Sequence, residues 1–196
     1  MERLTYPVPT PSGIRGVLSA IYSKPAEFYW QVERIEVLNP IRYISFKCNE
    51  VKTKAGRNTI LVEDDRTQRQ TVALQDVRYR ITARIIKRDG FSGTEAQLQE
   101  QFRRRAEGGK CYFQPSMGLR QFPAYFAWGS SGDAPIDLDL DLGYMVYDVF
   151  DLHKWKVTKK AEPAVSLFHA KLIRDVLEVP PYESELVLKG GAPDAQ

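Results

Sequence analysis

Cysteine and histidine are scarce in this chain, which has two of each among its 196 residues. Cys48 and Cys111 are too few for a disulfide framework and indicate a reducing compartment. His153 and His169 have no third ligand at metal spacing, so we expect no metal and no other cofactor. The sequence also lacks a lysine-containing Gly-rich phosphate loop and a Gly-x-Ser-x-Gly nucleophile elbow, which argues against those enzyme classes.

Long apolar runs are missing too. No stretch is long enough to span a membrane and no signal-peptide pattern stands at the start, so we expect a cytoplasmic protein without a membrane partner. The composition is that of a globular protein, with 43% hydrophobic and 27% charged residues and a net charge of +3. This mild charge neither requires nor excludes a nucleic-acid partner, so the positions of the cations must decide.

Two segments have clear helix patterns. In PTPSGIRGVLSAIY, Thr10 is the predicted N-cap and Pro11 suits the first turn. In SGTEAQLQEQFRRRAEGG, Thr94 and Gln97 fit a capping box, and Gly108 suits the left-handed position after the helix.

The clearest strand is TVALQDVRYRITARIIKRDG, where apolar residues alternate with mainly basic ones. Its basic face carries Arg78, Arg80 and Arg84. A solvated strand face is the ordinary interpretation, and three arginines at period two also suit a polyanion such as RNA.

The order of elements is helix, strand, strand, helix, strand and then a β-rich remainder. This order predicts an α+β protein with a ferredoxin-like (RRM-type) domain that lacks its first strand. We expect this domain over residues 1–127, with a protruding hairpin or loop at 47–70. A small antiparallel β lobe is expected over residues 128–190, followed by a loose tail at 191–196.

The segment GGKCYFQPSMGLRQFPAYF sets Lys110, Gln114 and Arg120 among five aromatic residues. It predicts either an ordinary strand pair after a helix or a surface for a nucleic-acid backbone, where one or two aromatics stack on bases and the rest are core. Arg103 and Arg104, at the end of the preceding helix, join the candidate RNA-binding cations, although they also suit the negative end of the helix dipole.

Several motifs occur in an order that points to a known family: ERLTYPVPTPSGIRGVLSAIYSKP, VERIEVLNPIRYIS, CNEV, FRRRAEGGKCYFQPSMGLRQFPAYF, DLGYMVYD and LEVP. On these motifs the chain resembles the Dvulg-subtype CRISPR-associated RAMP family, the "Cas-five" subunit of type I-C Cascade, from Glu2 to about Pro180. The resemblance implies a CRISPR-Cas antiviral defence protein that binds the 5′ handle of CRISPR guide RNA. Its implied partners are the guide RNA, the backbone and large subunits of Cascade, and target DNA.

The resemblance also implies metal-independent cutting of precursor RNA by a tyrosine and a Lys-His pair. Tyr22 matches the tyrosine, whereas Gln97 and Leu98 stand where the pair is expected. Residues 89–101 contain no lysine, arginine or histidine that a shifted register could supply. Loss of one acid–base partner lowers a rate by about 10² to 10⁴, so whether the chain is an enzyme stays open.

Three interpretations therefore remain. The first is a Cascade subunit that binds the guide handle without cutting, and the second is the same subunit acting as a precursor-RNA endoribonuclease with substitute residues. The third is a general ferredoxin-like RNA-binding scaffold protein. Tyr22 is the catalytic candidate in the second and a helix-end packing residue otherwise.

Overall fold

The computed structural model describes residues 3–53, 56, 59–129, 132–133, 136–156 and 163–190. The chain divides into two compact units, one of residues 1–8 and 39–77 and the other of residues 9–38 and 78–196. The expected tail at 191–196 lies outside the described residues. Within the described part, no helix is long and apolar enough to cross a bilayer.

The second unit is built on one antiparallel sheet of six strands, in the order β4-β1-β7-β6-β5 with β8 paired to β6. These strands are β1 (Phe28–Val37), β4 (Tyr79–Lys87), β5 (Leu140–Asp148), β6 (Ser166–Ile173), β7 (Val176–Glu178) and β8 (Val187–Lys189). The chain is thus α+β, as expected. The predicted boundary between residues 127 and 128 falls inside this unit, where the C-terminal strands continue the sheet of β1 and β4.

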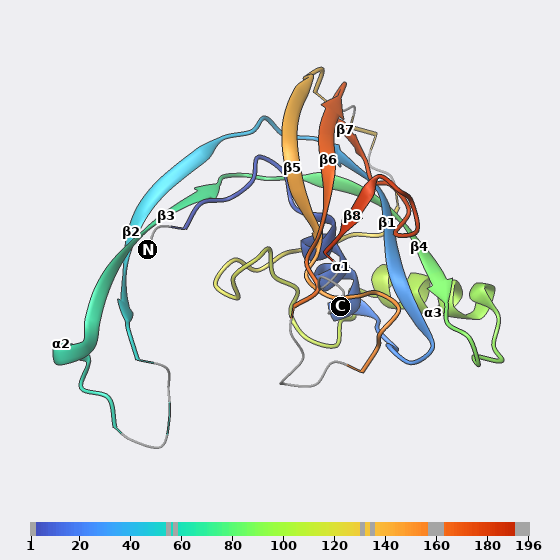
Figure 1. Cartoon of the computed structure of the whole chain (residues 1–196), viewed down its shortest axis with the longest axis horizontal. Helices are drawn as coiled ribbons and strands as arrows, with labels where there is room; N and C mark the ends of the chain where they lie inside the picture. Colours follow the sequence, from blue (N-terminus) through green and yellow to red (C-terminus); the bar gives the residue numbers. More distant parts are fainter. Residues whose placement is uncertain are drawn as a thin grey trace, which may run out of the picture. The chain divides into compact units, whose positions relative to one another are not determined.

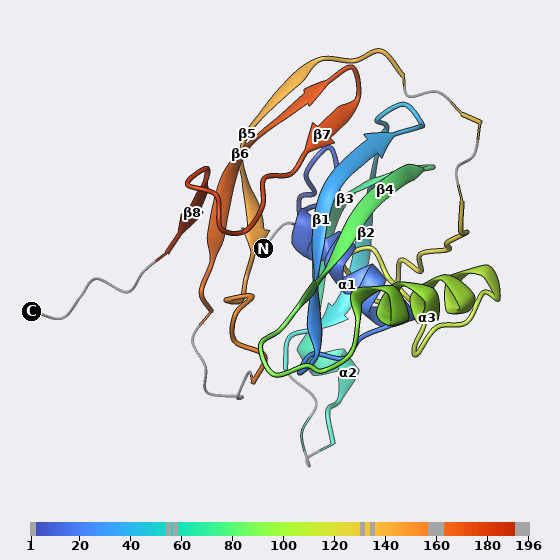
Figure 2. The same cartoon turned by 90° about the vertical axis from the view of Figure 1, so that its right-hand side faces the viewer.

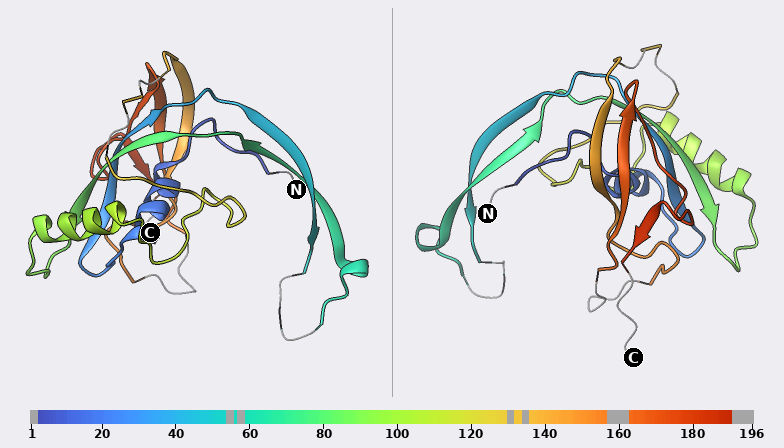
Figure 3. Two further views of the ribbon diagram at one scale, coloured as in Figure 1. Left: turned by 180° about the vertical axis from the view of Figure 1, so that it is seen from behind. Right: turned by 45° about the horizontal axis from the view of Figure 1, so that its top comes forward.

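Two helices pack behind this sheet, as the right-hand view of Figure 3 shows. α1 (Pro11–Ile21) contacts β1 and β5, and α3 (Glu95–Glu107) contacts β4. Thr10 caps α1 by accepting a hydrogen bond from the Gly13 N–H, and Thr94 and Gln97 form the predicted capping box of α3.

The end of α3 differs from the prediction in one residue. Gly108 has a φ of −81°, whereas Gly109 has a φ of +62° and takes the left-handed conformation. The helix ends in a tight turn in which Gly109 N–H donates to the Ala106 carbonyl and Lys110 N–H to the Arg105 carbonyl. A side chain at the left-handed position would be strained, so glycine is needed one residue later than expected.

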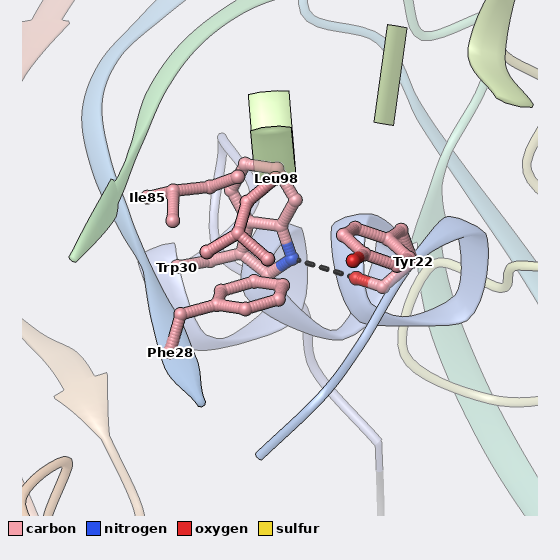
Figure 4. Close-up of a cluster of buried hydrophobic side chains, with 5 residues drawn as sticks. All are labelled: Tyr22, Phe28, Trp30, Ile85 and Leu98. Carbon is pink, nitrogen blue, oxygen red and sulfur yellow. Dashed lines mark hydrogen bonds between the residues drawn. The ribbon is translucent and has the colours of Figure 1, made fainter. Parts of the chain in front are cut away.

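The core between helices and sheet is largely aromatic (Figure 4). Its buried members are Tyr22, Phe28, Trp30, Ile85 and Leu98. The Trp30 indole N–H donates to the main-chain carbonyl of Tyr22 at 2.9 Å, which ties the end of α1 to β1. A buried indole needs such an acceptor, because an unpaired buried donor is destabilising.

The first unit consists mainly of a long curved hairpin (Figure 1). β2 (Tyr43–Val51) pairs antiparallel with β3 (Arg66–Leu74), and the short α2 (Val62–Asp65) precedes β3. The hairpin thus extends beyond the 47–70 range expected from sequence. Arg3 forms a parallel bridge with Thr71, so this N-terminal residue pairs with β3.

Asp175 is an unusual residue of the turn between β6 and β7, two strands that Figure 2 shows side by side. Its side chain is fully buried, and neither carboxylate oxygen has a hydrogen-bond partner among the described residues. Burial raises the pKa of Asp175, the main chain of Leu138 opposes this rise, and the carboxylates of Asp137 and Asp139 add to it. Asp175 also has a φ of +63°, a conformation that asparagine tolerates as well as aspartate does.

We predict that Asp175→Asn stabilises the protein at neutral pH. Because the folded-state pKa is raised, the folded state binds the proton more tightly than the unfolded chain, and stability falls as pH rises through this window. Removing the buried charge should therefore raise the free energy of unfolding by about 1 to 3 kcal/mol at pH 7, with the gain vanishing in acid. Denaturant unfolding of the variant and the wild type, at pH 7 and in acid, measures this difference in the free energy of unfolding.

The control for this substitution is Asp76→Asn. Asp76 also has a positive φ, of 52°, but its side chain is exposed. Asp76→Asn should leave the free energy of unfolding unchanged. An equal gain in stability from Asp76→Asn and Asp175→Asn would contradict the assignment of the effect to burial.

Candidate nucleic-acid interface

The segment after α3, residues 109–128, folds as an anchored irregular loop. Tyr112 N–H donates to the Ala20 carbonyl at 2.7 Å, which fixes the start of the loop to the end of α1. Ser116 and Pro123 form an isolated antiparallel bridge, and Met117 N–H donates to the Phe122 carbonyl at 2.9 Å. The strand-pair interpretation is therefore right only for one bridge at the tip of the loop.

The aromatic residues of this loop are more exposed than the sequence predicted. Tyr112, Phe113 and Tyr125 are 79%, 62% and 88% exposed, whereas Phe122 and Phe126 are partly buried. Exposed aromatic rings have a large apolar surface without a packing partner, which is the arrangement on which nucleic-acid bases stack. Three rings, rather than the one or two expected, are available for this.

Cations accompany these rings. Lys110 and Arg120 on the loop and Arg104 in the last turn of α3 are exposed, and no ion pair or hydrogen bond of their side chains occurs within the described residues. Gln114, by contrast, donates its side-chain amide to the Ala124 carbonyl at 2.8 Å and so helps to hold the loop. Arg103 pairs with Glu100 in its own helix, with Nε and Oε2 3.1 Å apart.

The three arginines of the β4 region are all matched by acids. Arg78 Nη2 lies 2.7 Å from Asp133 Oδ2, and Arg80 Nη1 lies 2.5 Å from Glu36 Oε2. Arg84 pairs with Glu33. Glu33 and Glu36 belong to β1, the strand beside β4. A neutralised cation attracts a phosphate less than a free one, so the role of these three arginines in RNA binding stays a prediction.

Tyr22, the catalytic candidate, is buried, with 3% exposure. Its hydroxyl donates to Gln101 Oε1 at 3.0 Å, and the Arg105 guanidinium lies 5.6 Å from the centre of its ring. Burial raises the pKa of Tyr22, while Lys24 and Arg105 oppose this rise and Glu27 adds to it. With a raised pKa, Tyr22 is deprotonated even more rarely at neutral pH than an ordinary tyrosine, so little of the phenolate that could accept a proton is present. This geometry suits the packing role of Tyr22.

The helix positions of the expected Lys-His pair have structural roles here. Gln97 completes the capping box of α3, and Leu98 is buried in the aromatic core. Sequence reasoning missed Gln101 and Arg105 as the neighbours of Tyr22. Their spacing of four residues on α3 places them on one side of the helix, a signal that could have identified them. No group of three or more potential metal ligands comes together within the described residues.

Comparison with known proteins identifies the family. The family described as "CRISPR-associated protein (Cas_Cas5)" matches residues 1–180. The chain belongs to the CRISPR-associated Cas5 family. One relative, "CRISPR pre-crRNA endoribonuclease Cas5d" of Mannheimia succiniciproducens, is 35% identical over 95% of this chain and 89% of its own length. A protein of the same name from Thermus thermophilus is 39% identical over 92% of this chain and 83% of its own length.

Two solved structures share the fold of this Cas5-family chain. A structure titled "Crystal Structure of CRISPR-associated Protein" superposes with a TM-score of 0.67 at 19% identity, over 94% of this chain and 87% of that one. A functionally uncharacterized protein from Streptococcus mutans superposes with a TM-score of 0.65 at 17% identity, over 93% and 86% of the two chains. At these identities the likeness concerns the fold alone.

Proposed function

We propose that this Cas5-family chain is a type I-C Cascade subunit that binds the 5′ handle of CRISPR guide RNA. The observation that carries the proposal is the loop of residues 109–128, with its three exposed aromatic rings and with Lys110 and Arg120, which have no acidic partner among the described residues. Unpaired RNA bases stack on aromatic side chains, and the backbone between them is neutralised by lysine and arginine. Family membership favours this reading over a general RNA-binding scaffold.

The arrangement of the second unit supports a ferredoxin-like, RRM-type description of its core. α1 and β1, then β4 and α3, follow one another in the order of that motif. β1 and β4 pair antiparallel, with both helices behind them. We propose that the loop of residues 109–128 is the part of this core that contacts the guide.

Removing the rings should weaken handle binding. We predict that Tyr112→Ala, Phe113→Ala and Tyr125→Ala each raise the dissociation constant for a handle RNA about 5- to 150-fold wherever a base stacks, because one stacked base contributes about 1 to 3 kcal/mol. Fluorescence anisotropy with labelled RNA measures this. Tyr144→Ala is the control, since Tyr144 is a similarly exposed tyrosine on β5; unchanged affinity in all three loop variants would contradict the proposal.

Salt dependence separates the free cations from the paired ones. Lys110→Gln with Arg120→Gln should flatten the slope of log affinity against log salt by about 1.4, at roughly 0.7 per phosphate contact on a single strand. Arg78→Ala with Arg80→Ala should flatten it less, because Asp133 and Glu36 already neutralise these cations. If the Arg78 and Arg80 substitutions flattened the slope more than the Lys110 and Arg120 substitutions, the RNA interface would have to be assigned to β4 instead.

The hairpin of β2 and β3 is proposed to contact nucleic acid in the assembled complex, with the target duplex as its partner. Directly opposed residues share one face of a strand pair, and one exposed face of this hairpin carries cations, amides and a hydroxyl without a carboxylate: Ser45, Lys47, Asn49, Arg66, Gln68 and Gln70. On the other face, Glu50 is bound by Arg3 and Arg69. A neighbouring backbone subunit is the alternative partner.

Charge reversal on the hairpin distinguishes these partners. We predict that Lys47→Glu with Arg66→Glu leaves assembly with guide RNA and other subunits intact but weakens binding of target duplex, because two cations become anions facing phosphate. Size-exclusion chromatography and gel-shift titration measure the two effects. Failed assembly would instead assign this face to a subunit, and unchanged target binding would contradict the proposal.

The second candidate function is cutting of precursor RNA without a metal ion. Two relatives that cover most of this chain are named pre-crRNA endoribonucleases, which favours this activity. The burial of Tyr22 means that other residues must supply most of the acid–base chemistry or that the local structure opens in the complex.

Cutting is tested with the chain's own repeat hairpin in EDTA on a denaturing gel. An endoribonuclease should give one defined cut at the base of the hairpin. Loss of about 10²-fold or more of the rate in Tyr22→Phe would make Tyr22 catalytic, and a smaller effect would assign it to the core. An uncut substrate that still binds tightly would leave handle binding as the function.

A further inference from the structure

A second cluster of titratable side chains lies in the same unit, between the end of β5 and β8. His153 Nε2 is 2.6 Å from Glu183 Oε1, and Lys189 Nζ is 3.3 Å from the other oxygen of Glu183. Arg88 Nη1 donates to the His153 carbonyl at 3.0 Å. The Glu183 carboxylate therefore lies between the His153 imidazole and the Lys189 ammonium, and Arg88 contacts the main chain of His153.

The buried ring of Tyr182 holds this cluster in place. Its centre lies 5.4 Å from that of the His153 ring and 4.2 Å from Lys189 Nζ. Asp151 Oδ1 accepts hydrogen bonds from the Tyr182 hydroxyl at 3.3 Å and from the main-chain N–H of His153 at 3.0 Å. The His153 and Glu183 side chains themselves are 55% and 62% exposed, so a ligand can reach them.

The residues just after His153 suit a nucleic-acid strand. Trp155 is exposed, and Lys156 Nζ lies 4.9 Å from its ring centre. Lys154, also exposed, is 3.6 Å from Asp151. An exposed tryptophan between two lysines offers a ring for base stacking and cations for the adjacent phosphates.

We propose that His153 and Glu183 are the acid–base pair of an RNA-cleaving centre in this chain. This inference rests on the second candidate function, metal-independent cutting of precursor RNA. Such cutting needs one group that accepts the 2′-OH proton, another that protonates the leaving oxygen, and a cation beside the phosphate. The two groups stand side by side here, whereas the described neighbours of Tyr22 contain no imidazole.

The chemistry balances without any other reactant. Glu183 accepts the 2′-OH proton as the 2′ oxygen forms its bond to phosphorus. The bond from phosphorus to the 5′ oxygen breaks, and protonated His153 gives its proton to that oxygen. The products are a 2′,3′-cyclic phosphate and a 5′-hydroxyl end. The proton on Glu183 then returns to His153 across their 2.6 Å contact. Lys189, whose Nζ lies 3.3 Å from Glu183, supplies the cation that balances the charge of the phosphate.

The experiment measures single-turnover cutting of repeat RNA in EDTA by the full chain. His153→Gln and Glu183→Gln should each lower the rate by about 10² to 10⁴, without changing the affinity for handle RNA. The matched control is His169→Gln, because His169 is the other histidine of the sequence and also faces a carboxylate, that of Asp141 at 3.4 Å. It should cut at the wild-type rate.

Several results would overturn the assignment of His153 and Glu183 as the acid–base pair. Wild-type rates in Glu183→Gln, a substitution that keeps size and hydrogen bonding, would overturn the inference even if His153→Gln failed to fold. Equal losses in His153→Gln and His169→Gln would also overturn it. An uncut wild-type reaction with tight handle binding would overturn the centre alone, whereas absence of both binding and cutting would overturn the proposed function as well.

Discussion

The hydrogen bond from the Trp30 indole to the Tyr22 carbonyl is the constraint on which the second unit is organised. It joins the end of α1 to β1, the strand that carries β4 on one edge and β7 on the other. The Trp30 ring in turn contacts Phe102 of α3, with ring centres 4.7 Å apart. One side chain thus links both helices to the sheet, and the loop of residues 109–128 starts where these elements meet, at its bond to Ala20. Aromatic contacts of this kind have specific geometry and fill large volumes, so they define the position of that loop.

The local parts of this fold could be predicted because their signals lie within a few residues. Thr94 and Gln97 cap α3 across three residues, and alternation along β4 identifies a strand without knowledge of its partner. The long-range parts could not. Gln31 donates to the Tyr147 hydroxyl and accepts from the Tyr182 N–H, contacts that span more than a hundred residues. Backbone pairing over a similar separation places β7 beside β1 and joins the expected C-terminal lobe to the main sheet. No periodicity in the sequence encodes which strand becomes the neighbour of another.

In the candidate site, too, the sequence predicted which residues are present but not how they are arranged. The sequence identified the rings and cations of the 109–128 loop, but not that Tyr112, Phe113 and Tyr125 are exposed while Phe122 is partly buried. Alternation along β4 also predicted a face of arginines. It could not predict their neutralisation, because the sequence of one strand does not show which charges the neighbouring strand carries. Glu33 and Glu36 lie on the neighbouring strand, where β1 has a register shift between Val32 and Arg34. Their carboxylates meet Arg84 and Arg80, which converts a basic row into ion pairs.

Ion pairing and burial affect two different properties of this chain, the attraction of RNA by its cations and the proton transfer that RNA cleavage needs. A cation attracts a polyanion through its uncompensated charge. We therefore expect the exposed Lys110 and Arg120 to contribute more to RNA binding than the more numerous arginines that already face carboxylates. Acid–base chemistry has a different requirement, since the proton must move to a group that titrates and is reachable by the substrate. Tyr22 is buried, and its hydroxyl donates to Gln101, so a substrate does not reach it in this structure. Its pKa is raised by burial, so it is rarely deprotonated at neutral pH. Leu98 is packed into the core at the place of an expected histidine, so α3 stabilises the fold at that point. For this reason we look for proton transfer among side chains elsewhere in the chain.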